Sequence, residues 1–293
     1  MEGNIRWVII TAIAPIAWGA TYFVTRQFLP ADTPLYGALL RALPAGLVLL
    51  AIRRRRPHGS WWWKSVVLGT INIAVFFVLV YVAAQVLPSS VASTIMATSA
   101  AVMMLVAWPL LSDRPRARGL AGAALGFLGV CIMLLTGAVE VNPLGVAASV
   151  AAMLLSSLGF ILTKKWSSEV DVVSLTAWQL IAGALVIAPV AMMVEGPFPA
   201  LDASAVIAFA FVSLIATALA FAAWFTGLKH LPAGTVGLIG LLNPVTGVLL
   251  GTLAASEVFG AQQLLGLVLV LAGIVLGQSR RRHPVLLEPS ASR

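Results

Sequence analysis

Residues 71–130 read INIAVFFVLVYVAAQVLPSSVASTIMATSAAVMMLVAWPLLSDRPRARGLAGAALGFLGV, and residues 215–274 read IATALAFAAWFTGLKHLPAGTVGLIGLLNPVTGVLLGTLAASEVFGAQQLLGLVLVLAGI. The two stretches align without a gap at a constant offset of 144, and 13 of the 60 pairs are identical. Apolar sequences raise chance identity, so the paired prolines and glycines weigh most: Pro88 with Pro232, Gly122 with Gly266, and Gly129 with Gly273. An offset of nearly half the chain indicates two copies of one unit.

The composition predicts an all-α polytopic membrane protein. Apolar residues make up 60% of the chain and charged residues 10%, with a mean hydropathy of +1.02, whereas a soluble domain is about a quarter charged. Ten stretches approach the roughly 20 residues that cross about 30 Å of hydrocarbon. We place these spans at about 7–26, 34–52, 64–86, 89–111, 119–138, 143–163, 173–194, 203–227, 233–255 and 261–278.

Each copy of the repeat therefore holds five spans. Because five is odd, the second copy enters the membrane in the opposite sense, and we expect ten transmembrane helices arranged as two inverted five-helix repeats. Inverted repeats around a midplane site are typical of secondary transporters. We expect one transmembrane domain over residues 1–279, with repeat one at about 5–138, repeat two at about 143–278, and a disordered cytoplasmic tail over 280–293. The first span lacks a convincing signal-peptide cleavage site, and the five-plus-five symmetry requires this span, so we expect it to be retained.

Positive charges mark one side of the bilayer. Sixteen of the 18 Lys and Arg residues fall on that side: Arg6, Arg53–Arg56, Lys64, Arg114, Arg116, Arg118, Lys164, Lys165, Lys229, Arg280–Arg282 and Arg293. The positive-inside rule then places both termini in the cytoplasm of a multi-pass inner-membrane protein and turns Glu140, Glu195, Asp202 and Glu257 outward. The net charge of +8 thus indicates the lipid bilayer as a partner and not nucleic acid.

Several motifs of ATP-driven proteins, hydrolases and metal sites are absent from the sequence. The chain has no phosphate-binding Gly-rich loop and no His-Glu-x-x-His motif, and its three histidines lie in loops or the tail. Its single cysteine, Cys131, permits no internal disulfide and no cysteine metal cluster. We therefore expect no enzyme activity, no metal and no cofactor. All ten Asp and Glu residues lie at or beyond span ends, which argues against a proton-driven pump and favours facilitation down a gradient.

Arg41 is the exceptional charge within the hydrocarbon. It lies about seven residues inside the second span, roughly 10 Å from the outer end. A guanidinium there costs about 2.5 kcal/mol or more on insertion scales. Three roles stay open: a structural or snorkelling arginine, a charge that tunes the cavity or a gate, and a direct contact with a substrate carboxylate.

Polar side chains recur near mid-depth of several spans, where they serve either interhelical hydrogen bonding or a shared substrate cavity. They are Asn72, Thr98, Ser99, Ser156, Ser157, Gln179, Thr217 and Asn243. Prolines at similar depth remove a backbone donor and can act as hinges; these are Pro15, Pro44 and Pro244. Asn243-Pro244 is the sharpest candidate, because it combines a side-chain amide with a helix break.

Aromatic residues divide into two groups. Packed or lipid-facing rings are one interpretation of Trp18, Tyr22, Tyr81 and Trp178, and a pocket for a flat apolar substrate is the other. A second group falls near cytoplasmic span ends and is typical of an interfacial belt: Trp7, Trp61–Trp63, Trp108, Trp166 and Trp224. Small-residue rows at Gly122, Gly126 and Gly129 and at Gly266, Gly273 and Gly277 indicate close helix packing within a monomer or across a homodimer.

Several segments carry a family resemblance. Trp18-Gly19-Ala20-Thr21, Arg41 with Ala45-Gly46, and above all Asn243-Pro244-Val245 through Leu249, Ser256-Glu257, Gly266 and Gly273 resemble the ten-helix EamA-type branch of the drug/metabolite transporter superfamily. The first copy departs from the family pattern, with Ala100 where the family usually has Pro and Asp113 where it usually has Glu. That departure questions a matched pair of proline hinges.

The resemblance implies a carrier for small-molecule substrates that works mostly outward by alternating access at a midplane cavity. The tryptophan content and the missing coupling carboxylate are similar to the YddG-like aromatic amino-acid exporters, which implies aromatic and other neutral amino acids as substrates. Alternatives are aliphatic amino acids such as threonine or homoserine, purine-type metabolites, and a lipid scramblase or channel.

Overall fold

A computed structural model gives the structure of the protein. It describes residues 2–30, 32–87, 89–134, 142–167, 169–255 and 260–277. These residues form helices joined by short connections, and no strand occurs among them. The all-α fold class predicted from the sequence is confirmed. The predictions for residues 280–293, Glu140 and Glu257 lie outside the described residues.

The helices fall into ten spans. Repeat one contains α1 (Glu2–Phe28), α2 (Pro34–Arg53), a third span of α3 (Trp61–Gly69), η1 (Thr70–Val75) and α4 (Phe76–Val86), a fourth of α5 (Ser89–Ala97) and α6 (Ser99–Leu111), and α7 (Ala117–Leu134). Repeat two contains α8 (Pro143–Trp166), α9 (Val172–Val194), an eighth span of α10 (Ala203–Ala210), η2 (Phe211–Leu219) and α11 (Ala220–His230), a ninth of α12 (Ala233–Ile239) and α13 (Leu242–Ala255), and α14 (Ala261–Gly277).

Length and hydropathy agree with membrane insertion. Six helical stretches among the described residues are by themselves long and apolar enough to cross a bilayer: Pro34–Arg53, Trp61–Ala83, Thr94–Leu111, Pro143–Trp166, Val172–Val194 and Ala203–His230. Shorter apolar helices cover Ile5–Thr21, Ala117–Ile132, Ala233–Gly247 and Ala261–Gly277. Large apolar side chains such as Met193 and Val275 are 85% and 72% exposed, as expected for an outer surface that contacts lipid chains.

Side-chain caps set the start of several helices. Asn142 Oδ1 accepts from the backbone N–H of Leu144 at 2.9 Å, directly before Pro143 at the first position of α8. Asp171 caps α9 and Asp202 caps α10 in the same way, each accepting from the N–H three residues on. Because these caps satisfy donors that the helix itself leaves open, each span begins at a defined residue.

The two repeats share the same helix irregularities. In span three the backbone changes to a π-helix at Thr70–Val75, and in span eight it does so at Phe211–Leu219. Adding the repeat offset of 144 to the first segment gives residues 214–219, inside the second segment. A rare local geometry at matching places is strong structural support for duplication, since π-helices form well under 1% of residues in general.

The broken spans match as well. Span four is interrupted at Thr98 and span nine at residues 240–241. The repeat offset of 144 maps Thr98 onto residue 242, within two residues of the second interruption. Pro244 explains the second break, because it removes a backbone donor. Span four breaks without a proline, at a place where Thr98 Oγ donates to the Ile95 carbonyl at 2.6 Å. The family usually has proline at the position of Ala100. Span four is nevertheless interrupted nearby, at Thr98, without a proline.

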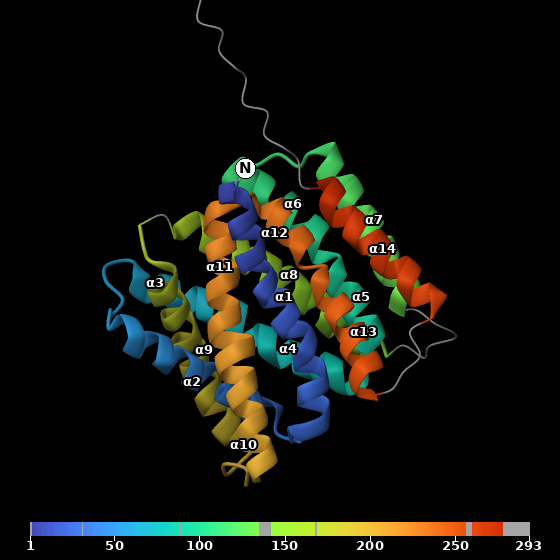
Figure 1. Cartoon of the computed structure of the whole chain (residues 1–293). Coiled ribbons are helices and arrows are strands. Elements are labelled where there is room, and N and C mark those ends of the chain that lie inside the picture. The colour runs from blue at the N-terminus through green and yellow to red at the C-terminus, as the bar shows by residue number, and fades with distance from the viewer. Residues whose placement is uncertain are drawn as a thin grey trace, which may run out of the picture.

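Helix pairing follows the duplication. Spans two and seven contact each other, as do four and nine, and five and ten. Span one packs on span eight, and its counterpart, span six, packs on span three. Figure 1 shows α7 and α14 side by side at one edge of the bundle and α2, α3 and α9 at the opposite edge, with α1 between them.

Glycines bring α7 and α14 into backbone contact. A Cβ at Gly122 would lie 2.5 Å from the carbonyl oxygen of Gly273, and a Cβ at Gly129 would lie 2.7 Å from that of Gly266. The glycine rows found in the sequence therefore join spans five and ten within one chain. Of the two alternatives, monomer packing explains these rows; whether the protein forms a homodimer stays a separate prediction.

We predict that Gly122→Ala destabilises the protein by overpacking, which typically costs about 1–3 kcal/mol. Gly119→Ala on the same helix is the matched control, because its Cβ would meet only the movable Met104 side chain at 3.2 Å and gains the same helix propensity. In thermal unfolding of purified protein, Gly122→Ala should melt about 2–10 °C below the control. Equal midpoints would contradict the backbone contact.

Candidate functional site

Two side chains bond the backbone of the π-helix in span eight, one from α1 and one from the π-helix itself. Trp18 in α1 donates its indole N–H to the carbonyl of Ala216 at 3.0 Å. Thr217 donates its hydroxyl to the carbonyl of Val212, five residues earlier, at 2.8 Å. A change of helical register leaves carbonyls without their usual donor, and hydrocarbon offers no water in exchange. Both mid-depth side chains thus stabilise the irregular backbone.

Arg41 reaches the same π-helix. Its Nε donates to Thr217 Oγ at 2.9 Å, and its guanidinium carbon lies 4.2 Å from the centroid of the Phe77 ring. The Arg41 side chain is only partly buried. Of the three open roles, lipid snorkelling is the least compatible with these contacts, since the guanidinium is directed toward span eight in the protein.

Tyr81 lies on α4 beside α2. Its hydroxyl packs against Gly37, where a Cβ would overlap the tyrosine oxygen. The hydroxyl is buried and has no hydrogen-bond partner in the structure. A buried hydroxyl without a partner costs about 1–3 kcal/mol, which makes Tyr81 a candidate for a ligand contact.

Aromatic rings from four spans meet in the interior. Trp18 lies 5.3 Å from Phe221 and 5.2 Å from Trp224 between ring centroids, and Phe160 lies 5.6 Å from Trp224. Phe77 joins through Phe221 at 6.1 Å. We call this group the central aromatic cluster: Trp18, Phe77, Phe160, Phe221, Trp224 and Phe225. The sequence singled out only Trp18 among these as a site residue, because phenylalanine in an apolar span carries no distinguishing signal.

The interfacial assignment of two tryptophans was wrong. Trp224 is 3% exposed and its Nε1 is buried without a partner, and Trp61 is 5% exposed. Trp62, Trp63 and Trp108 are half or more exposed, as an interfacial belt requires. Position near a span end was the only criterion available from the sequence, and it does not reveal which way a helix face points.

A buried amide cluster ties spans three, six and seven. Asn72 Nδ2 donates to Gln179 Oε1 at 2.7 Å and to Thr163 Oγ at 3.2 Å. All three side chains are buried. This geometry favours interhelical hydrogen bonding for Asn72 and Gln179, and Thr163 is a member that the sequence analysis missed. A substrate contact of either amide stays a prediction.

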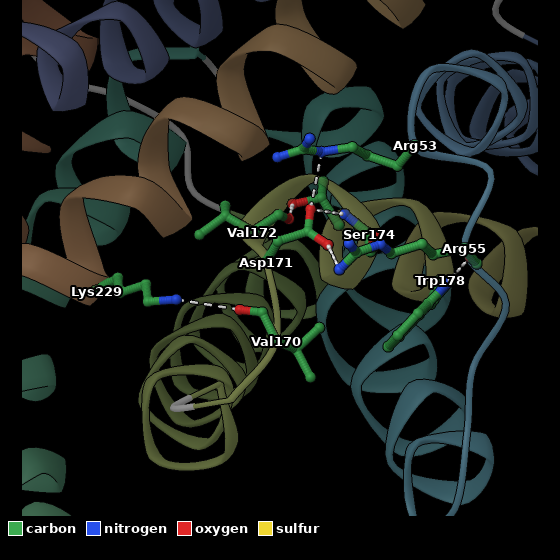
Figure 2. Close-up of polar contacts among 9 residues, drawn as sticks. Arg53, Arg55, Val170, Asp171, Val172, Ser174, Trp178 and Lys229 are labelled. Carbon is green, nitrogen blue, oxygen red and sulfur yellow. Dashed lines mark hydrogen bonds and ion pairs between the residues drawn. The ribbon is translucent and has the colours of Figure 1, made fainter.

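Trp178 is held near the loop that follows α2. It is buried, and its Nε1 donates to the carbonyl of Arg55 at 2.8 Å (Figure 2). Its ring lies 5.7 Å from Trp61 and 6.1 Å from His58. These contacts favour a structural role that anchors the loop after α2, and they do not join Trp178 to the central aromatic cluster.

The remaining site and hinge residues predicted from the sequence do not all lie at one place in the bundle. Ser157 is fully buried and contacts the Met153 sulfur at 4.0 Å, while Ser156 donates to the Met153 carbonyl. Ser99 and Asn243 are partly buried and adjoin the breaks in spans four and nine; the repeat offset maps one onto the other. Helices α1 and α2 continue through Pro15 and Pro44. The Tyr22 side chain lies outside the described residues.

Asp171 organises the polar contacts at the end of the bundle shown in Figure 2, where α2 ends and α9 begins. Besides capping α9, its carboxylate pairs with Arg53 Nε at 3.2 Å and Arg55 Nη1 at 3.8 Å. The neighbouring Val170 carbonyl accepts from Lys229 Nζ at 3.1 Å, which brings α11 to the same loop. Burial alone would raise the pKa of the Asp171 carboxyl, but hydrogen bonding from Ser174 and the Arg53 and Arg55 charges outweigh burial and hold the pKa below its ordinary value.

We predict that Asp171→Asn keeps the helix cap but loses the ion pairs, which lowers the free energy of unfolding by about 0.5–1 kcal/mol at neutral pH. Asp202→Asn is the matched control, since Asp202 caps α10 and forms no ion pair within the described residues. Because the folded pKa of Asp171 is depressed, its contribution is present above the unfolded pKa of about 4 and fades as pH falls through the folded value. A constant gap between wild type and Asp171→Asn from pH 7 to pH 3 would contradict this account.

Comparisons with known proteins agree with this architecture. The chain is 36% identical over 285 residues to protein PecM of Dickeya dadantii, which covers 94% of this chain and 95% of that protein. It is 27% identical to the uncharacterized inner membrane transporter YedA of Escherichia coli K12, covering 89% and 87%. It is 25% identical to a probable amino-acid metabolite efflux pump of Salmonella typhimurium, covering 91% and 93%.

A solved crystal structure shares the fold, with a TM-score of 0.79 at 19% identity over 93% of this chain and 96% of the other. The EamA-like transporter family matches twice, at residues 5–135 and 143–277, which is consistent with two repeats. Its members are membrane transporters and not enzymes. The chain belongs to the EamA-like transporter family.

Proposed function

We propose that this transporter exports aromatic and other neutral amino acids by alternating access at the centre of the bundle. The observation that carries the proposal is the central aromatic cluster, which gathers rings from spans one, three, six and eight. A flat apolar side chain gains both area burial and ring stacking from such a surface, about 0.5–1.5 kcal/mol per aromatic pair beyond burial. The name of the Salmonella relative, a probable amino-acid metabolite efflux pump, supports the substrate class.

The proposed site includes Trp18, Tyr81, Ser99 and Asn243, with Arg41 as its charge. Trp224 joins them, since its buried indole N–H has no partner in the structure. Asn72, Ser157, Trp178 and Gln179 already have buried contacts with other parts of the protein, so we give them a supporting role. Tyr22 remains in the proposed site on its sequence position alone.

We propose facilitation without proton coupling. Among the described residues, acidic side chains occur only near span ends, for example Asp113, Asp171, Glu195 and Asp202. A proton relay inside a membrane generally needs Asp, Glu or His within the spans. Substrate should therefore move down its own gradient in either direction.

The substrate prediction is tested with Trp18→Ala in liposomes. Loss of one aromatic contact should weaken discrimination between phenylalanine and alanine by several-fold to about tenfold. Trp62→Ala is the matched control, because Trp62 is 60% exposed and lies outside the cluster. Transport of phenylalanine, threonine and a nucleoside is compared in both variants and wild type, with and without a protonophore.

Three results would overturn parts of this proposal. Unchanged discrimination in Trp18→Ala would remove the aromatic cluster from the site. Threonine or the nucleoside as the better substrate of the wild type would replace aromatic amino acids by the corresponding alternative. Concentrative uptake that vanishes with the protonophore would show that transport is coupled to protons, and it would overturn the proposal of facilitation.

We also propose that both termini face the cytoplasm of the inner membrane. Two loop glycines test this orientation, Gly59 after the Arg53–Arg56 run and Gly196 after α9. Both have positive φ and open space around them, so cysteine substitutions are equally strained. In a Cys131→Ala background, an impermeant thiol reagent added to intact cells should label Gly196→Cys and spare Gly59→Cys. The reverse pattern would invert the topology.

A further inference from the structure

Two exposed tryptophans stand at the start of α3. Trp62 is 60% exposed and Trp63 is 53% exposed. Val66 lies four residues after Trp62, on the same helix face, and is 50% exposed. Tryptophan favours the depth of the lipid headgroups, because its ring is apolar and its N–H is polar. This face of α3 therefore has the character of a surface that contacts both headgroups and acyl chains.

Lys64 brings a positive charge to the same surface. Its Nζ lies 5.4, 5.9 and 5.8 Å from the ring centroids of Trp61, Trp63 and Trp166. Trp63 and Trp166 are in edge contact, with 5.3 Å between their ring centroids. Because Trp166 is the last residue of α8, these contacts join the start of span three to the end of span six. Three rings thus hold the ammonium group at one place by cation–π attraction.

The basic run after α2 adjoins this group of tryptophans. The Arg55 carbonyl accepts from Trp178 Nε1 at 2.8 Å, and the Trp178 ring centroid lies 5.7 Å from that of Trp61. His58, in the same loop, lies 6.1 Å from Trp178 between ring centroids. The loop between α2 and α3 therefore runs beside the tryptophans that surround Lys64.

Acidic side chains balance only part of the positive charge in this loop. Arg53 and Arg55 pair with Asp171. Arg54 and Arg56 are exposed, and neither forms an ion pair within the part of the chain that the structure describes. One carboxylate thus faces a run of four arginines. The excess positive charge complements an anion at this end of the bundle.

We propose that this surface binds the headgroup of an anionic phospholipid. We call it the lipid site, and it consists of Arg54, Arg56, Trp62, Trp63, Lys64 and Trp166. Lys64 donates to the lipid phosphate, Arg54 and Arg56 add electrostatic attraction, and the acyl chains lie along the exposed apolar face of α3. This inference goes beyond the proposed function, because it assigns a bound lipid and holds whichever substrate is carried.

Two phospholipids that differ in net charge test the lipid site. Phosphatidylglycerol and phosphatidylethanolamine both carry a phosphate, but the ammonium group of the second offsets its charge. Binding of each lipid to purified protein in a neutral detergent is measured by native mass spectrometry. Wild type should prefer phosphatidylglycerol, and Lys64→Gln should lose about fivefold of that preference, which is the contribution of one basic residue near an anionic surface. Lys64→Arg keeps the charge and should retain the preference.

Arg118→Gln is the matched control. Arg118 is an exposed arginine of α7, which lies at the opposite edge of the bundle from α3 (Figure 1). The substitution changes the net charge as Lys64→Gln does, and it should leave the lipid preference unchanged. An equal loss in both variants would indicate diffuse attraction by net charge and overturn the site. A wild type that binds both lipids alike, or a loss in Lys64→Arg as large as in Lys64→Gln, would overturn it as well.

A second measurement separates a lipid from a soluble anion. Phosphatidylglycerol should raise the thermal unfolding midpoint of wild type more than that of Lys64→Gln, whereas glycerol 3-phosphate at the same concentration should raise neither. The midpoints without added lipid show whether each variant is folded. Equal stabilisation of wild type by the lipid and by glycerol 3-phosphate would assign the surface to soluble phosphate compounds and overturn the lipid site.

Discussion

Backbone hydrogen bonding in hydrocarbon is the constraint on which this structure depends. Because lipid offers no partner to an open carbonyl, a change of helical register inside the membrane needs a donor from the protein itself. Spans three and eight change register at matching places, and in span eight Trp18 and Thr217 serve the carbonyls of Ala216 and Val212. In span eight these two side chains therefore support irregular backbone, and contacts with the same segment orient Trp18 and Arg41, which we propose as site residues.

Thr217 shows how stability and proposed function are linked. The hydroxyl that stabilises the π-helix is also the acceptor that orients Arg41. Trp18 likewise bonds the π-helix with its nitrogen and contributes its ring to the central aromatic cluster. A charged group on α2 and an aromatic ring on α1 are thus both fixed by contacts with one irregular segment.

Hydropathy and the paired prolines and glycines were sufficient to predict the spans and the duplication, and the resemblance of segments such as Asn243-Pro244-Val245 to a known family predicted the family. They did not reveal the facing of side chains, because in a uniformly apolar helix no polar stripe marks the inner side. Trp224 was therefore placed at the interface although it is buried, and the hydrogen bond from Trp178 to the Arg55 carbonyl was not anticipated. Ala100 in place of proline questioned a matched pair of hinges, but span four still breaks at Thr98, whose hydroxyl donates to the Ile95 carbonyl.

The central claim is that substrate binds at the centre of the bundle, in a site that includes Ser99 and Asn243 beside the central aromatic cluster. Ser99 and Asn243 are related by the repeat offset and adjoin the breaks in spans four and nine. The direct measurement is the rate at which a small soluble thiol reagent modifies Ser99→Cys and Asn243→Cys, each in a Cys131→Ala background, with and without phenylalanine. The account predicts that phenylalanine slows modification at both positions. Unchanged rates at both positions, in variants that still transport phenylalanine, would contradict it.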